Sequence, residues 1–161
     1  MTTAEYNKCV DQHADGVYRF ILKNLKDEER ARDIVQESFS RMWEKAEEIT
    51  AEKAKSYLFT TAYHTMIDDI RREKRTSRLN ESHTDRLSVS HNWTDLKEVL
   101  QIALDTLPEI QKAVITLRDY EGYSYEEIGR ITSLSESQVK VYIYRGRVAL
   151  KNYIGSLDRV I

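Results

Sequence analysis

The stretch SYEEIGRITSLSESQVKVYIYRGR at residues 124–147 says most about the fold. Ser124 with Glu127, and Ser135 with Gln138, have the spacing of capping boxes, and each box marks the start of a helix. We expect one helix from residue 125 to about 132, a turn of three or four residues, and a second helix to about residue 155. Five apolar side chains have the spacing that packs the two helices together, and they are Ile128, Ile131, Leu134, Val139 and Ile143.

Two helices joined by a tight turn, with polar and basic residues on the second, form the helix-turn-helix arrangement. In that motif the start of the second helix enters a major groove. From the residues alone, an ordinary helical hairpin in a bundle remains the alternative. The candidate DNA-contacting side chains of the second helix are Ser135, Ser137, Gln138, Lys140, Tyr142, Tyr144, Arg145 and Arg147. Inward packing is the alternative for Tyr142.

The rest of the chain also has helical periodicity. Helices are expected after the capping residues Thr2, Asp27 and Thr50, from residue 96 to near Pro108, and from Pro108 to Gly122. Residues 76–93 are rich in Ser, Thr, Asn and His and have no regular apolar spacing, which is typical of a linker. The sequence therefore predicts an all-α protein with two small helical domains, residues 1–75 and 94–161, joined by a flexible linker.

Composition narrows the class of protein further. A single Pro and five Gly in 161 residues favour long helices. Cys9 is the only cysteine, so no internal disulfide can form. The chain starts without a basic and apolar leader, and no stretch has the length of apolar sequence that a membrane helix needs, so we expect a cytoplasmic protein.

Charge is distributed in blocks along the chain. The formal net charge is -2 overall, but residues 51–80 carry +3, residues 81–122 carry -4 and residues 123–161 carry +2. Local basic segments bind phosphate even where the whole chain is near neutral. Solvated helix faces remain the alternative interpretation of each block.

Several motifs resemble bacterial sigma factors of the sigma-70 family. Residues 104–154 are similar to region four, through Leu107-Pro108-Glu109, the segment at residues 121–128, and Ser135, Val139-Lys140, Arg145 and Arg147. Residues 31–43 (ARDIVQESFSRMW) and 56–75 (SYLFTTAYHTMIDDIRREKR) are similar to region two. With these two regions and a short linker, the chain resembles the extracytoplasmic-function subgroup, and the resemblance covers most of the chain.

The chain departs from the family pattern at a few positions. Ser133 stands where a Gly is common in the turn, Ser137 and Gln138 replace a small residue and Thr, and Tyr142 replaces an Arg. His64 stands where an Asn is frequent. These changes bear on which bases are read and leave the overall role intact.

The resemblance implies a role for each segment. It implies docking on the clamp coiled coil of core polymerase by Asp33, Gln36, Glu37, Phe39 and Trp43. It implies contact with the minus-ten element by Phe59, Tyr63, His64, Arg71, Arg72, Lys74 and Arg75. Core packing is the alternative for Phe39, Trp43 and the aromatic residues, and a solvated helix end is the alternative for the basic ones.

Enzyme function is not indicated. Acidic pairs such as Asp68 and Asp69 are adjacent in sequence and diverge around a helix, and the four His residues and Cys9 have no zinc-ligand spacing. We therefore expect no catalytic residue, no metal, no cofactor, no small-molecule substrate and no membrane insertion.

The expected function is that of a sigma factor, which binds core RNA polymerase and promoter DNA at the minus-ten and minus-thirty-five elements. The resemblance also allows a membrane-bound anti-sigma factor as a partner. A stand-alone helix-turn-helix regulator and a helical adaptor that binds only protein are the alternatives.

Overall fold

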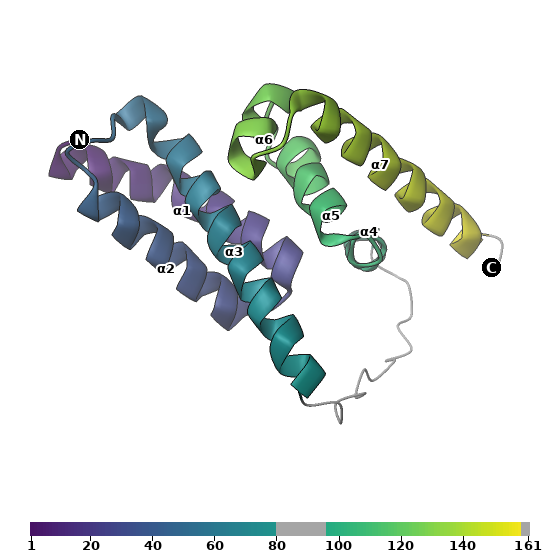
Figure 1. Cartoon of the computed structure of the whole chain (residues 1–161). Coiled ribbons are helices and arrows are strands. Elements are labelled where there is room, and N and C mark those ends of the chain that lie inside the picture. Colours follow the sequence, from purple (N-terminus) through teal and green to yellow (C-terminus); the bar gives the residue numbers. More distant parts are fainter. Residues whose placement is uncertain (80–95, 159–161) are drawn as a thin grey trace.

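Helices account for the ordered elements of the computed structural model, which describes residues 1–79 and 96–158 (Figure 1). We call the elements before residue 80 the first domain and those after residue 95 the second domain. The first domain contains α1 (Thr3–Leu25), α2 (Glu28–Glu44), the 3-10 turn η1 (Ala51–Lys53) and α3 (Ala54–Leu79). The second contains α4 (Leu96–Asp105), α5 (Glu109–Ile115), the π-helical turn η2 (Thr116–Tyr120), α6 (Tyr125–Thr132) and α7 (Glu136–Asp158). No strand occurs in these two described ranges, and the expected all-α class is confirmed.

Local side-chain caps start the helices where the sequence predicts them. The Thr2 side chain accepts from the Glu5 backbone N–H, and the Asp27 side chain accepts from that of Arg30. These bonds satisfy donors that the first turn of a helix leaves unpaired. Thr50 precedes η1 but forms no side-chain cap bond. The 3-10 turn η1 leads directly into α3.

The end of α3 differs from the expected domain boundary at residue 75. The helix continues to Leu79, and the Thr76 hydroxyl donates to the Arg72 carbonyl. Four residues of the expected linker are thus helical, because nothing in that stretch breaks the helix. The rest of the expected linker, residues 80–93, lies outside the described part of the chain.

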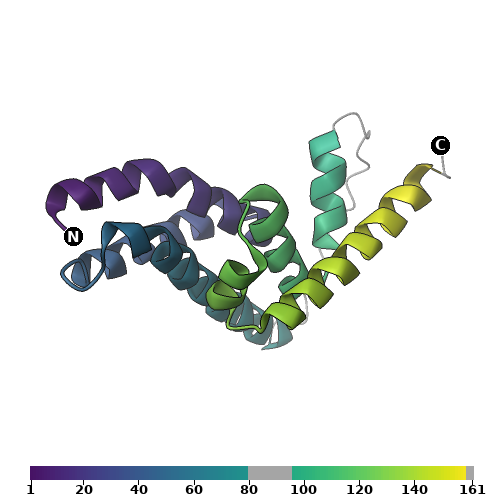
Figure 2. The same cartoon turned by 90° about the horizontal axis from the view of Figure 1, so that it is seen from above.

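The two domains pack against each other. In Figure 1, α3 crosses in front of α1 and lies between α2 on one side and α5 and α6 on the other, and α7 runs along the outer side of the second domain. Figure 2 shows the far end of α7 projecting away from the first domain. α3 contacts α6, and α1 contacts α5 and η2.

The buried side chains reflect this packing. One cluster joins Phe20, Leu58 and Phe59 of the first domain to Tyr123 and Ile128 of the second. A smaller cluster lies between α4, α5 and α7. One buried cluster therefore includes side chains of both domains, because burying apolar surface between them is favourable for domains of this size.

Candidate nucleic-acid interface

Short-range contacts define the start of α6 and the turn that follows this helix. The Ser124 hydroxyl accepts from the Glu127 backbone N–H at 3.1 Å, and the Glu127 carboxylate accepts from the Ser124 N–H at 3.0 Å. At the other end, Ser133 has a φ of 62°, a left-handed conformation that glycine adopts more easily. A Cβ on Gly129 would lie 2.8 Å from the Leu134 carbonyl oxygen, so only glycine lets the turn close this tightly.

The start of α7 is a second capping box, and it uses a residue expected to read bases. The Gln138 side-chain oxygen accepts from the Ser135 N–H at 2.9 Å, and the Ser135 hydroxyl accepts from the Gln138 N–H at 3.1 Å. Ser137 is exposed beside them. Lys140 forms an ion pair with Glu136 at 3.6 Å. The exposed start of the helix is therefore ordered before any DNA is bound.

Further along α7 the expected contacts diverge. Tyr144 is 71% exposed and Arg145 is exposed, whereas Tyr142 is half-buried and packs against the core. Arg147 donates two hydrogen bonds to Asp119 of η2, and these bonds raise the pKa of its guanidinium. A phosphate that binds Arg147 must therefore share it with Asp119.

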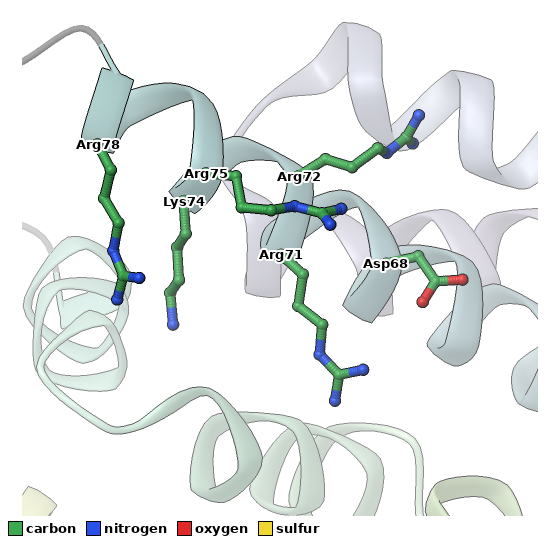
Figure 3. A pocket seen from close by; sticks show the side chains of 6 residues that line it. All are labelled: Asp68, Arg71, Arg72, Lys74, Arg75 and Arg78. Carbon is green, nitrogen blue, oxygen red and sulfur yellow. The ribbon is translucent and has the colours of Figure 1, made fainter.

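The basic end of α3 presents a surface to the solvent and to the second domain. An open cleft of about 570 Å³ lies at this end of the helix (Figure 3). It is lined by Asp68 and by the exposed side chains of Arg71, Arg72, Lys74, Arg75 and Arg78. Figure 3 shows Arg71, Lys74 and Arg78 extending toward the helices of the second domain, while Arg72 points the other way.

Arg78 belongs to this surface although it was expected in the linker. It lies seven residues after Arg71 and four after Lys74, which is the spacing of one helix face. The absence of a helix breaker between residues 75 and 79 is the sequence signal that could have placed it there.

The aromatic residues expected at the minus-ten element are divided by the structure. His64 is exposed, but Phe59 is 1% exposed and Tyr63 is 5% exposed. The Phe59 ring centroid lies 5.1 Å from that of Tyr123. Burial, and to a lesser degree the Glu109 carboxylate, raises the pKa of Tyr63. In this arrangement Phe59 and Tyr63 cannot stack on DNA bases, which corrects their expected exposure. They are buried because α3 packs against α1 and the second domain.

The expected polymerase-docking residues lie on α2. Asp33, Gln36 and Glu37 are exposed, and Glu37 pairs with Arg41 of the next turn at 2.5 Å. Trp43 is 52% exposed and packs against the ring of Tyr6. Phe39, however, is buried in the core, which corrects its expected place on the docking surface because its position on α2 faces α1.

Residues 1–79 and 96–158 contain no group of three or more His, Cys, Asp or Glu side chains arranged to hold a metal ion. None of the helices described is both long and apolar enough to cross a membrane.

Comparison with family models matches two parts of the chain. Residues 9–76 match sigma-70 region 2, and residues 97–150 match sigma-70 region 4. The two matches lie in the order of the two structural domains and together span most of the chain.

Several curated proteins are similar over nearly the whole chain. ECF RNA polymerase sigma factor SigM of Bacillus subtilis is 30% identical over 151 residues, which is 90% of this chain and 92% of that protein. RNA polymerase sigma factor SigV of the same organism is 32% identical, covering 85% and 83% of the two chains. ECF RNA polymerase sigma factor SigE of Mycolicibacterium smegmatis is 31% identical over 92% of this chain, which spans 61% of the length of SigE.

Solved structures share the fold. The sigma factor RpoE from Bartonella quintana, in complex with the anti-sigma factor NepR, superposes with a TM-score of 0.79 at 19% identity, covering 93% of this chain and 96% of that one. CnrH in complex with the cytosolic domain of CnrY gives a TM-score of 0.71 at 22% identity, covering 94% and 88%.

Proposed function

We propose how this chain works from the premise that it belongs to the sigma-70 family as an extracytoplasmic-function (ECF) sigma factor, a subunit that binds core RNA polymerase and directs transcription initiation at promoters. The observation that carries this premise is the presence of both sigma regions, in order, in one chain that matches ECF sigma factors almost from end to end. A stand-alone regulator would have no use for region two, so the premise disfavours that alternative.

Polymerase docking is assigned to the exposed face of α2. Asp33, Gln36 and Glu37 supply polar and acidic groups, and Trp43 supplies a large apolar side chain near them. An exposed Trp beside acidic groups suits a partner surface that is basic around an apolar pocket. The support is the exposure of these four residues together on one helix.

Minus-ten binding is assigned to α3, within a domain of residues 1–79. Arg71, Arg72 and Arg75 are exposed and can neutralise phosphates, with His64 exposed further back along the helix. Phe59 and Tyr63 are proposed to stack on unpaired bases once the second domain moves away from them.

Minus-thirty-five binding is assigned to α7, within a domain of residues 96–158. Side chains at the helix start reach base edges first, so Ser137, Gln138 and Lys140 read sequence. Tyr144, Arg145 and Arg147 lie further along and contact the sugar-phosphate backbone, which fixes the position of the helix without reading sequence.

The partners and location follow from the same premise. The structure of RpoE, which shares this fold, is a complex with an anti-sigma factor. We therefore propose that this chain also binds an anti-sigma factor and that this partner can be membrane-bound. The chain acts in the cytoplasm, where it meets RNA polymerase and DNA, and leaves catalysis to the core enzyme.

Run-off transcription with core polymerase tests the proposal. Core polymerase plus this chain should give discrete transcripts from genomic fragments, and core polymerase alone should give none. A matched template with its upstream element scrambled should lose most of the product. Sequence-specific DNA binding by the chain without any dependence on core polymerase would favour the stand-alone regulator instead, and binding to neither polymerase nor DNA would favour the adaptor.

A further inference from the structure

A stripe of apolar side chains runs along the exposed face of α7. Val141, Tyr144 and Val148 are 44%, 71% and 41% exposed, and their spacing of three and four residues places them on one face of the helix. None of the three packs on either buried cluster of the described residues. A single exposed apolar side chain needs no explanation, but three in succession on one helix face indicate a contact with a partner.

The two valines of this apolar stripe are unfavourable at exposed helix positions. The branched β-carbon of Val restricts χ1 in a helix, and its helix propensity is below that of Lys, Glu or Ala. Exposure of its methyl groups to water adds a further cost. The same restriction holds the methyl groups in one orientation before a partner binds, so little side-chain entropy is lost on binding. An exposed Val is therefore suited to contact with a small apolar group.

The packing of α7 on the second domain turns Val141 outward. Val139 and Ile143, two residues before and after it, are 0% and 2% exposed. Side chains two residues apart point to nearly opposite sides of a helix, so burial of these two neighbours directs Val141 to the solvent. The start of the helix is also fixed, by the capping box of Ser135 and Gln138.

Basic side chains border the apolar stripe. Lys140 and Arg145 are exposed beside Val141 and Tyr144, and Lys151 is exposed one turn after Val148. Residues 137–157 contain no Asp or Glu, and Glu136 at the helix start pairs with Lys140. Apolar groups between cations match a groove of DNA, in which base edges lie between two rows of phosphates. The charges around the stripe therefore favour duplex DNA over an apolar protein groove as its partner.

We propose that Val141 reads the C5-methyl group of a thymine in the major groove of the minus-thirty-five element. This methyl group distinguishes thymine from the other bases in the major groove, and an apolar side chain recognises it by direct contact. The inference rests on the proposed function of α7, and it adds a specificity-determining residue to that function. Val141 was not among the expected contacts, because only polar, basic and aromatic side chains were expected to contact DNA.

The place of Val141 along α7 agrees with the size of the groove. Val141 lies five residues after Glu136, the first residue of α7, or about 8 Å along the helix axis, whereas Val148 lies about 18 Å along it. The major groove is about 12 Å wide, and the first residues of a recognition helix contact the base edges. Of the two valines, only Val141 therefore reaches the bases.

Removal of the methyl group from the DNA tests the inference with an unaltered protein. Duplexes that bind the chain, with or without core polymerase, are first selected from genomic fragments and from a random library. Each thymine of the selected upstream element is then replaced in turn by deoxyuridine, which lacks only the C5-methyl group. At one position the replacement should weaken binding about three- to fivefold, which corresponds to the loss of one buried methyl group.

Val141→Ala tests whether this loss depends on the valine. The variant should bind the thymine duplex at least as weakly as the parent binds the deoxyuridine duplex, and deoxyuridine should then cause no further loss. Val148→Ala is the matched control, because it removes a valine of similar exposure from the same helix face beyond the groove. This control should keep the full response to deoxyuridine. Circular dichroism checks that both variants retain the helical content of the parent.

Three results would overturn the methyl contact. The first is a parent chain whose binding does not respond to deoxyuridine at any position. The second is a Val141→Ala variant that keeps the full response. The third is equal weakening of core polymerase binding by both alanine variants without any response to the methyl group, which would show that the apolar stripe contacts protein.

The same experiments separate the methyl contact from the proposed function. A chain that selects no duplex, with or without core polymerase, would contradict both. Selected duplexes without methyl dependence would contradict the methyl contact alone and leave the minus-thirty-five assignment of α7 intact. If the chain selects duplexes but gives no run-off with core polymerase, the sigma-factor function is contradicted, while the deoxyuridine series still decides the contact of Val141.

Discussion

At the scale of single residues, one glycine sets how closely α5 and α7 approach. A Cβ at position 146 would lie 2.3 Å from Cδ1 of Ile115, which is buried between the two helices, and 3.5 Å from Cβ of Gln111. By contrast, a Cβ at Gly155 of the same helix would meet nothing within 4 Å. Alanine substitutions at Gly146 and Gly155 can therefore be compared to separate the intrinsic helix preference of alanine from its effect on packing.

We expect Gly146→Ala to lower the free energy of unfolding by about 1–3 kcal/mol, because Ile115 must leave its packed position. Gly155→Ala should raise that free energy by about 0.5–1 kcal/mol, since alanine restricts the unfolded chain and fits the helix. Urea denaturation of both variants measures the difference. Equal and small effects at the two positions would contradict the close packing of α5 on α7.

Gln138 has two roles that substitution can separate. Its side-chain oxygen caps the start of α7, and the same side chain is proposed to read a base. Gln138→Ala should change the preference among minus-thirty-five variants by about 1–3 kcal/mol at one position, and it also removes the cap. Gln138→Glu keeps a capping oxygen while removing the amide donors, so it should change base preference with the helix start intact.

Binding to a small library of upstream-element variants at two salt concentrations is the measurement for Gln138. Arg147→Ala serves as the comparison, because a phosphate contact should weaken binding to every sequence and flatten the salt dependence. If all three variants weakened every sequence to the same extent, the proposed orientation of α7 in the groove would be wrong.

At the scale of elements, α2 combines a buried face with an exposed acidic face. Ile34, Phe39 and Met42 pack into the core, while Asp33 and Glu37 lie exposed one turn apart. Because the two acids take no part in the core, changing their charge should leave the fold intact. The exposed pair can therefore be tested for partner binding without loss of stability.

Charge reversal of both acids, Asp33→Lys with Glu37→Lys, should weaken the affinity for core polymerase by tenfold or more, about 1.4 kcal/mol or more. Asp11 and Asp15 form an exposed acidic pair with the same spacing on α1, and their reversal to Lys is the matched control. Equilibrium binding to labelled core polymerase and circular dichroism are the measurements. Equal weakening by both double variants would indicate a general charge effect rather than docking by α2.

At the scale of the whole molecule, the charge blocks of the sequence meet in space. Glu109 and Glu121 belong to the acidic block at residues 81–122, and they pair with Lys74 and Arg19 of the first domain. Asp105 of the same block pairs with Lys26. Lys74 belongs to the basic block at residues 51–80, whereas Arg19 and Lys26 are single cations within residues 1–50. The three ion pairs show that carboxylates of the acidic block attract basic side chains of the first domain.

Limited proteolysis checks the domain organisation. Arg86 is the only Lys or Arg among residues 80–95, whose composition is typical of a linker. Trypsin should cut the free chain first at Arg86 and leave two helical fragments, and the ion pairs between the two domains should keep the fragments together in gel filtration at low salt. Arg86→Gln should abolish this first cut. Early cleavage inside the helices in place of the cut at Arg86 would contradict the two-domain organisation.

Much of the fold could be predicted because its signals are local. The caps at Thr2, Asp27, Ser124 and Ser135 each bond a backbone group three residues away, so their spacing in the sequence is the interaction itself. The helix expected from residue 125 to about 132 is confirmed as α6. The expected site residues on α7 follow from the same local pattern. The end of α3 was predicted four residues too early, because the local signal there is only the absence of a helix breaker.

The sequence by itself determined the helices, the helix-turn-helix and the resemblance to a family, because each depends on residues within a few turns of one another. Only the tertiary structure decided that Phe59 and Tyr63 are covered and that Arg19 meets Glu121, 102 residues away. Periodicity shows that a helix has an apolar face, but it does not say what packs on that face. Which surfaces of the two domains meet depends on matching shape and charge between segments that are distant in the chain, and folding alone brings them together.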